Sequence, residues 1–243
     1  MIDGENEAQS PATTLSALDE AFARVPAPAS IAACPCCRHS GDYAILLRRR
    51  RRDLTGSDLG AYTYRALTTV GSATDFRYLA GRILQLSHTR DAAMPDLEVV
   101  YGKLGRAGWQ SWPEAEAITA VMDALWRDQF TDGRPEVSIG TVLCALGSAR
   151  GTVAARLIEW GELAGRAWVQ RLHEFVSQHC RRKGDVTVPS NAYWDKGAGE
   201  YGELVDWLNG GAALGAVVAA FERADDPKTL ELLSEIHAVL DRG

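Results

Sequence analysis

The sequence lacks the long apolar runs and the leader features that would place it in or across a membrane. No apolar stretch approaches the roughly 20 residues that a helix needs to span a bilayer. The first seven residues are acidic and lack the basic and apolar regions of a signal peptide. The five cysteines are therefore expected in a reducing compartment, without a disulfide framework. We expect a cytoplasmic protein with no membrane association.

Motifs of the common catalytic and cofactor sites are also missing. The chain has no phosphate loop, no dinucleotide fingerprint and no Gly-x-Ser-x-Gly elbow. His173-Glu174 lacks the second histidine of a zinc-protease motif, and Gly210-Gly211 is better explained as a helix break than as a phosphate cradle. No carboxylate pair stands out from the predicted solvated helix faces. We therefore name no catalytic residue, and an enzyme of unrecognised type remains an alternative.

The charge balance leaves little basic surface for nucleic acid. Against 32 acidic residues stand 26 basic ones, a formal net charge of −6, which argues against a general nucleic-acid surface. The exception is the run Arg48–Arg52, where a local contact with phosphate or RNA is conceivable and Arg49 and Arg50 are candidate binding residues. Because no glycine–aromatic cluster accompanies the run, a solvated basic loop, or pairing with acidic residues, is favoured.

Apolar residues recur at helical spacing through most of the chain, and alternation of period two is almost absent. The stretch from Ser57 to Leu86 shows this best: it predicts a helix over 59–70, ended by Gly71, and a second helix capped by Thr74. Two helices joined so closely form an αα-hairpin. The fold class is all-α, built from antiparallel helical hairpins without a substantial sheet. Since no motif repeats at a fixed period, an irregular α-hairpin array and a globular bundle both remain open.

Further helix boundaries follow from capping signals. Ser111-Trp112-Pro113-Glu114 predicts a helix start with a capping box, and Asp226-Pro227 predicts the start of the last helix. A helix over 162–180 is expected to be closed by the basic residues 181–183. Residues 186–202 are expected to be the least regular segment, with a surface loop or a short extended piece. We predict a mobile tail over residues 1–13 and a single helical domain over 14–243.

A small cysteine cluster is the one candidate metal site. Cys34 and Cys37 have Cys-x-x-Cys spacing, with Cys36 between them and His39 close by, and such a turn commonly supplies two ligands of a tetrahedral zinc site. The remaining ligands would be distant: Cys144, His173, His179 or Cys180. The alternative is that these thiols pack as small hydrophobic groups at a turn. A redox role for the Cys-Pro-x-Cys spacing is not favoured, because no strand precedes it.

One aromatic pair lies in the segment expected to be irregular. The seven tryptophans are mostly at stripe or helix-start positions, where core packing is the default. Tyr193 and Trp194 differ, because they lie in the stretch 191–195, where loop composition suggests a pocket lining or a surface for a partner.

The chain from Cys34 to Leu86 carries a recognisable pattern of cysteine, leucine and aromatic positions. The matching residues are Cys34, Cys36, Cys37, Leu46, Leu47, Tyr64, Ala66, Thr68, Thr69, Gly71, Asp75, Phe76, Arg77, Tyr78, Ile83 and Leu84. This set resembles an uncharacterised family of bacterial all-helical proteins with an N-terminal Cys-x-Cys-Cys or Cys-x-x-Cys motif. The resemblance implies a helical fold and a bacterial, cytoplasmic setting, and it implies no activity.

These observations favour a non-catalytic helical interaction or regulatory module whose partner is a protein. The alternatives are a helical domain supported by zinc at Cys34 and Cys37, and an enzyme of unrecognised type.

Overall fold

The computed structural model describes residues 11–34, 43–131, 133 and 135–241. The chain divides into two compact units, Met1–Leu125 and Trp126–Gly243, and the boundary falls within helix α6 (Ala115–Asp128). The described residues form twelve α-helices and a single two-stranded hairpin, which confirms the all-α fold class. Pro11–Thr13 of the expected tail belong to the first helix, and residues 1–10 lie outside the described residues. The single domain over 14–243 stays a prediction.

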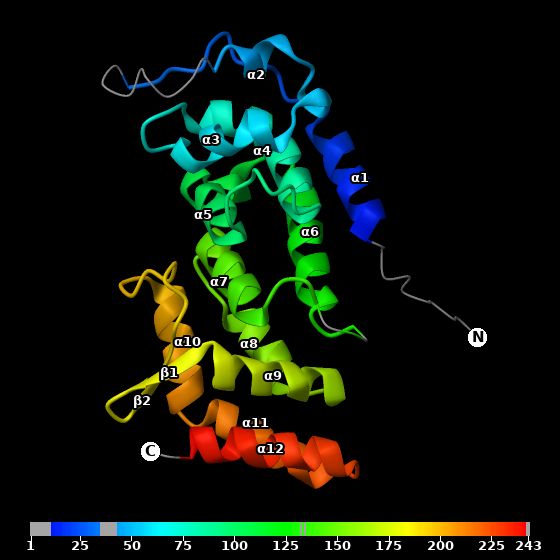
Figure 1. Ribbon diagram of the computed structural model, residues 1–243, viewed down its shortest axis with the longest axis vertical. Helices are drawn as coiled ribbons and strands as arrows, with labels where there is room; N and C mark the ends of the chain where they lie inside the picture. Colours follow the sequence, from blue (N-terminus) through cyan, green and yellow to red (C-terminus); the bar gives the residue numbers. More distant parts are fainter. Residues whose placement is uncertain (1–10, 35–42, 132, 134, 242–243) are drawn as a thin grey trace, which may run out of the picture. The chain divides into compact units, whose positions relative to one another are not determined.

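The N-terminal unit packs its helices around α4. Its elements are α1 (Pro11–Phe22), α2 (Ile45–Arg48), α3 (Gly56–Arg65), α4 (Ala73–His88), α5 (Leu97–Ala107), most of α6, and two 3-10 turns, η2 (Arg51–Asp53) and η3 (Trp109–Ser111). Helix α4 contacts α1, α3 and α5 (Figure 1). Phe22, Tyr62, Phe76 and Tyr101 are completely buried in this unit. Burial of such rings is the largest favourable contribution to the stability of a core of this size.

Helix α3 ends earlier than the apolar pattern predicts. The stripe extends to Val70, but α3 ends at Arg65, and Leu67 adopts a left-handed φ of 63°. The amide of Leu67 donates to the carbonyl of Val70 at 3.0 Å, which closes a turn in place of the last helical residues. Ala66 and Val70 are nevertheless buried and Leu67 is half-buried, so most of the apolar positions identified the core correctly although the local conformation differs.

The residue that caps α4 is Ser72 and not Thr74. The Ser72 hydroxyl accepts from the amide of Asp75 at 3.3 Å, and the Asp75 carboxylate accepts from the amide of Ser72 at 2.7 Å, which is a complete capping box. Thr74 lies inside the first turn and is exposed.

Replacing Ser72 by alanine should therefore lower the free energy of unfolding by about 1 kcal/mol, because the hydroxyl that accepts from the amide of Asp75 and donates to its carboxylate is lost. Thr74→Ala is the matched control and should change it by less than about 0.5 kcal/mol, as is usual for exposed positions. Urea unfolding of both variants measures the difference. Equal effects would contradict the capping role of Ser72.

The predicted capping box at the start of α6 is wrong, because its glutamate has a different partner. The Ser111 hydroxyl donates to the carbonyl of Gly108 within η3, and α6 begins only at Ala115. The carboxylate of Glu114 accepts two hydrogen bonds from the guanidinium of Arg77, both at 2.8 Å. Glu114 is 6% exposed, so this bidentate pair links α4 to the start of α6 from a largely buried position.

The C-terminal unit contains six further helices and the hairpin. Its elements are α7 (Ile139–Arg150), α8 (Ala154–Gly161), α9 (Arg166–Gln178), β1 (Cys180–Lys183), β2 (Val186–Pro189), α10 (Gly199–Asn209), α11 (Ala212–Arg223) and α12 (Pro227–Leu240). Helix α12 packs along α9 and against α11, and α10 packs against β2 (Figure 1). The predicted start at Asp226 is confirmed, since its side chain caps α12, and Ser138 caps α7 in the same way. Gly210 and Gly211 separate α10 from α11 as predicted.

The basic residues 181–183 do not close a helix, and this prediction is wrong. They belong to strand β1, which pairs antiparallel with β2 in the register Cys180↔Pro189 to Lys183↔Val186. Gly184, with φ of 62°, supplies the turn conformation that the hairpin requires. On the outer edge of β2, the side-chain amide of Asn209 donates to the carbonyl of Thr187 and accepts from its amide, at 2.9 and 2.8 Å. These bonds satisfy backbone groups that no third strand covers.

Among the described residues, no single helix has both the length and the apolar composition needed to cross a bilayer. Helices α10 and α11, bent by 48° relative to each other, meet the criteria of length and composition only when taken together.

Candidate functional site

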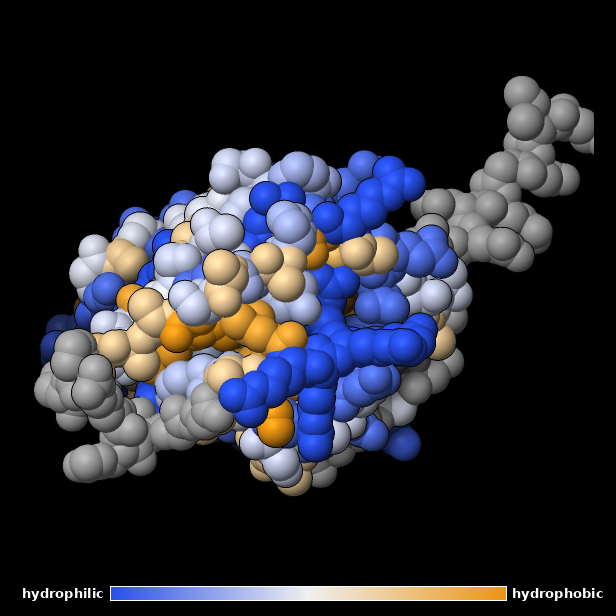
Figure 2. Space-filling model, turned by 90° about the horizontal axis from the view of Figure 1, so that it is seen from above, coloured by the Kyte–Doolittle hydropathy of each residue, from blue (hydrophilic) through white to orange (hydrophobic). Residues whose placement is uncertain are grey.

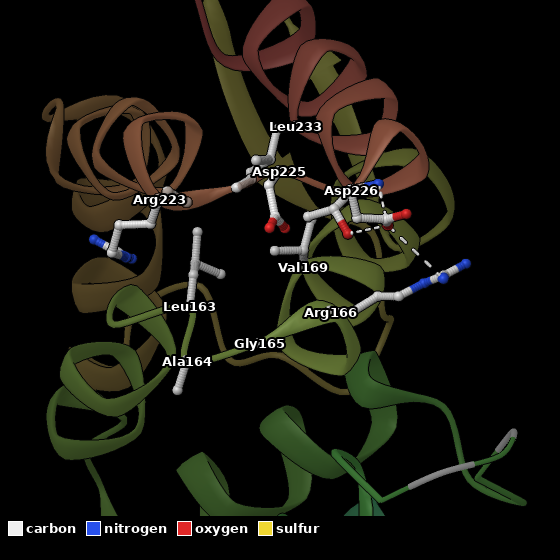
Figure 3. Close-up of a pocket in the computed structure, with 12 residues that line it drawn as sticks. Leu163, Ala164, Gly165, Arg166, Val169, Arg223, Asp225, Asp226 and Leu233 are labelled. Carbon is white, nitrogen blue, oxygen red and sulfur yellow. Dashed lines mark hydrogen bonds and ion pairs between the residues drawn. The ribbon is translucent and has the colours of Figure 1, made fainter.

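A pocket of about 480 Å³ opens in the C-terminal unit where α9 begins and α11 ends. Its lining comes from residues 163–169 on one side and from residues 220–233 on the other (Figure 3). Gly165 is the N-cap of α9 and offers no side chain to the first turn. Across the pocket, Asp226 caps α12 and Pro227 occupies the first helical position, where its fixed φ suits the helix. Two helix starts and one helix end therefore surround the same cavity.

The floor of the pocket is apolar. Val169 and Leu233 project from α9 and α12 and are 2% and 0% exposed. Leu163 is 4% exposed although its φ of 43° lies in the left-handed region, which leucine disfavours. The burial of its side chain offsets this local strain. The floor can therefore accept an apolar group without desolvating a polar one.

The rim carries charges of both signs, and most of them are already paired. Asp226 accepts from the hydroxyl and the amide of Thr229 at 2.8 and 3.0 Å and lies 3.8 Å from the guanidinium of Arg166. The hydrogen bonds from Thr229, assisted by Arg166, lower the pKa of Asp226 below its ordinary value. Arg223 donates to the carbonyl of Glu162 at 2.9 Å.

Asp225 is the charged residue of the rim that has no hydrogen bond or ion pair to any described residue. Figure 3 shows its carboxylate directed into the pocket, between Leu163 and Val169, whereas the guanidinium groups of Arg166 and Arg223 extend outward on opposite sides. The open charge in the pocket is therefore negative.

Among the described lining residues, the charged side chains are carboxylates and guanidinium groups. These lining residues include no cysteine, serine, histidine or tyrosine, and the hydroxyl of Thr229 donates to Asp226, a bond that holds it in the cap of α12. A nucleophile would need an adjacent general base within hydrogen-bond reach.

A second hollow of about 380 Å³ lies beyond Arg166, where His173 on α9 contacts Glu235 on α12 at 2.6 Å.

Only one of the predicted zinc ligands is among the described residues. Cys34 is half-buried, and its amide donates to the carbonyl of Thr69 at 2.9 Å. Cys36, Cys37 and His39 lie outside the described residues. The described residues contain no group of three histidine, cysteine, aspartate or glutamate side chains placed to hold a metal ion. Zinc binding at Cys34 and Cys37 stays a prediction.

The distant zinc candidates all belong to the C-terminal unit, where the two histidines have carboxylate neighbours. Cys144 is completely buried in α7. Burial raises the pKa of the Cys180 thiol to about 12, which keeps it protonated at neutral pH. The imidazoles of His173 and His179 lie near Glu235 and Glu174.

Arg49 and Arg51 of the arginine run bind other residues of the N-terminal unit. Arg51 donates to the carbonyls of Phe22 and Tyr78 at 2.6 and 3.1 Å and lies over the Tyr78 ring. Arg49 forms an ion pair with Asp58 at 2.9 Å, whereas Arg50 is exposed. The ion pair of Arg49 agrees with the alternative favoured from the sequence, in which arginines of the run pair with acidic residues of the protein. A contact of Arg49 or Arg50 with nucleic acid stays a prediction.

Apolar side chains are exposed next to these arginines. Ile45 on α2 is 38% exposed and Leu47 is half-buried, and Arg48 follows directly. Figure 2, which views the chain from the end at which α2 lies, shows long hydrophilic side chains beside and across an apolar strip.

Tyr193 and Trp194 face different environments. Trp194 is 5% exposed and packs edge-on against Tyr201 with ring centroids 6.3 Å apart, whereas Tyr193 is 47% exposed. Of the pair, only Tyr193 is exposed enough to meet a partner, and the predicted binding role stays a prediction.

Comparison of the chain with protein-family models, with curated protein sequences and with solved structures gave no match. The resemblance of residues 34–86 to a bacterial helical family therefore stays a prediction.

None of the pocket residues was singled out as functional from the sequence. Asp226 was recognised only as part of a helix start, and residues 163–169 only as part of a helix. No local signal could have joined these two segments, since about 60 residues separate them along the chain.

Proposed function

We propose that the protein is a non-catalytic helical module that binds a protein partner, and that the pocket of the C-terminal unit receives part of that partner. The observation that carries the proposal is the combination of an apolar floor with a charged rim. Leu163, Val169 and Leu233 form an apolar backing of the cavity, and the charges around it offer orientation. Pockets that bind ligands commonly have this composition and a volume of about 300–1,000 Å³.

The proposed setting is the cytoplasm of a bacterium, which the resemblance of residues 34–86 supports.

Obstructing the rim of the pocket should weaken partner binding. Ala164 belongs to the lining and is exposed, so Ala164→Trp adds an indole at the rim without disturbing the core. Val218→Trp is the control, because Val218 is 45% exposed on α11 and is absent from the lining. The tagged full chain is used to capture partners from an extract of the source cells, and the dissociation constant of the purified pair is then measured. We expect Ala164→Trp to weaken binding at least tenfold and Val218→Trp to leave it unchanged.

Two results would overturn the proposal. One is repeated capture that retains no specific partner. The other is a partner that binds the Ala164→Trp variant as tightly as the unaltered chain.

A further inference from the structure

The unpaired charge in the pocket is a carboxylate placed over apolar side chains. Asp226 is satisfied by Thr229 and Arg166, whereas Asp225 has no hydrogen bond or ion pair to a described residue. Its carboxylate is directed into the cavity between Leu163 and Val169 (Figure 3). A ligand that placed a cation here would pair with the rim carboxylate that has no partner among the described residues.

The end of α11 adds to the negative potential at the same place. Ala220, Arg223 and Ala224 line the pocket, and they form the last turn and the C-cap of this helix. The last carbonyls of a helix have no intrahelical partner and favour a cation. Arg223 could have supplied that cation, but it donates to the carbonyl of Glu162 and extends away from the cavity.

Asp225 makes an anionic ligand a poor fit. An anion inside the cavity would meet this carboxylate, whereas the guanidinium groups of Arg166 and Arg223, which contact Asp226 and the carbonyl of Glu162, extend outward on opposite sides. A cation meets Asp225 directly and leaves both arginine contacts intact.

We infer that the pocket binds an ammonium group carried on an unbranched alkyl stem, supplied by a lysine side chain of the partner protein. The inference rests on the proposed function and specifies which group of the partner enters the pocket. The ammonium pairs with Asp225, and the four methylenes of the stem enter the cavity beside Leu163 and Val169. Lysine combines these two properties, because its stem is apolar and only its end is charged.

The test uses two probes that differ only in the ammonium group. Nα-acetyl-lysine methylamide and Nα-acetyl-norleucine methylamide are titrated into the full chain, and the methyl NMR signals of Val169 and Leu233 are followed. We expect the lysine probe to shift these signals and to bind at least threefold more tightly than the norleucine probe, as a partly exposed ion pair allows.

Asp225→Asn should remove this preference and leave the two probes with equal affinity. Asp225 is exposed in the connection before α12, so the variant should keep the fold, and unchanged signals away from the pocket confirm it. Glu222→Gln is the matched control, because Glu222 is exposed on α11 and does not line the pocket. This variant should retain the full preference for lysine.

Equal binding of the two probes to the unaltered chain, or an Asp225→Asn variant that keeps the preference, would overturn the inference. So would hexylamine binding at least tenfold more tightly than the lysine probe, since the natural ligand would then be a free amine. If Ala164→Trp weakens partner binding while the probes show no preference, the proposed function stands and the lysine inference falls. If the lysine probe binds through Asp225 while Ala164→Trp leaves partner binding intact, the proposed function falls.

Discussion

Replacing Trp160 by alanine should lower the free energy of unfolding of the C-terminal unit by about 3–5 kcal/mol, because the substitution empties the centre of an aromatic cluster. Trp160 is completely buried on α8. Its ring meets Trp126 and Phe175 edge-on, with centroids 5.8 and 5.4 Å apart, and stacks on Trp207 at 5.8 Å. Such aromatic pairs contribute beyond the area that they bury.

Ile158→Ala is the matched control for Trp160→Ala. Ile158 lies two residues earlier on the same helix and is 71% exposed, so the control should cost less than about 0.5 kcal/mol. Urea unfolding of the full chain, followed by far-ultraviolet circular dichroism, measures both changes. A cost for Trp160→Ala no larger than that of the control would contradict the central position of this ring.

Replacing Arg171 by leucine should destabilise the same unit by about 2–4 kcal/mol, because it leaves a largely buried carboxylate and two carbonyls, one of them buried, without their donor. Arg171 is 7% exposed on α9. Its guanidinium donates to the carbonyls of Gln129 and Gly133, at 2.9 Å each, and to the carboxylate of Glu174. Arg171→Lys should recover only part of the loss, since one ammonium cannot reproduce three donors in a planar fork.

Arg166→Leu is the control on the same helix, where the arginine side chain is 49% exposed and lies 3.8 Å from its carboxylate. This change should cost less than about 1 kcal/mol, as is typical of exposed ion pairs. Removing Glu174 together with Arg171 should restore part of the stability, because the uncompensated charge is then absent. Urea unfolding gives all four values. Equal costs for Arg171→Leu and Arg166→Leu would show that the buried bonds of Arg171 do not stabilise this unit.

The helical periodicity of the sequence identified the fold class and much of the core. The apolar stripe from Leu59 to Val70 predicted buried residues at Ala66 and Val70 correctly, although the helix ends before them at Arg65. Burial follows from the packing of apolar side chains against the rest of the unit. The end of a helix depends instead on whether a local turn competes with the next helical residues. At Leu67 that turn is closed by a bond to Val70, which the apolar pattern does not encode.

Partners of polar side chains were predicted less well than apolar positions. Glu114 has the spacing of a capping box, yet it pairs with Arg77, which is 37 residues away. A carboxylate at a helix start gains more from a bidentate guanidinium in a largely buried position than from a single amide. Residues 181–183 were predicted to close a helix because basic residues after an apolar stripe are typical of a helix end. The strand that pairs with them, β2, comes later in the chain, so the local pattern does not indicate it.

The sequence by itself therefore determined the features that depend on neighbouring residues. These include the helical stripes, the cap and proline at Asp226-Pro227, and the break at Gly210-Gly211. Only the tertiary structure decided the pocket and the arginine networks. The pocket joins residue 163 to residue 233, and Arg51 and Arg171 bind backbone carbonyls, which every residue carries. Because every residue has a backbone carbonyl, the sequence does not indicate which carbonyl accepts from a given arginine. Tertiary packing decides it.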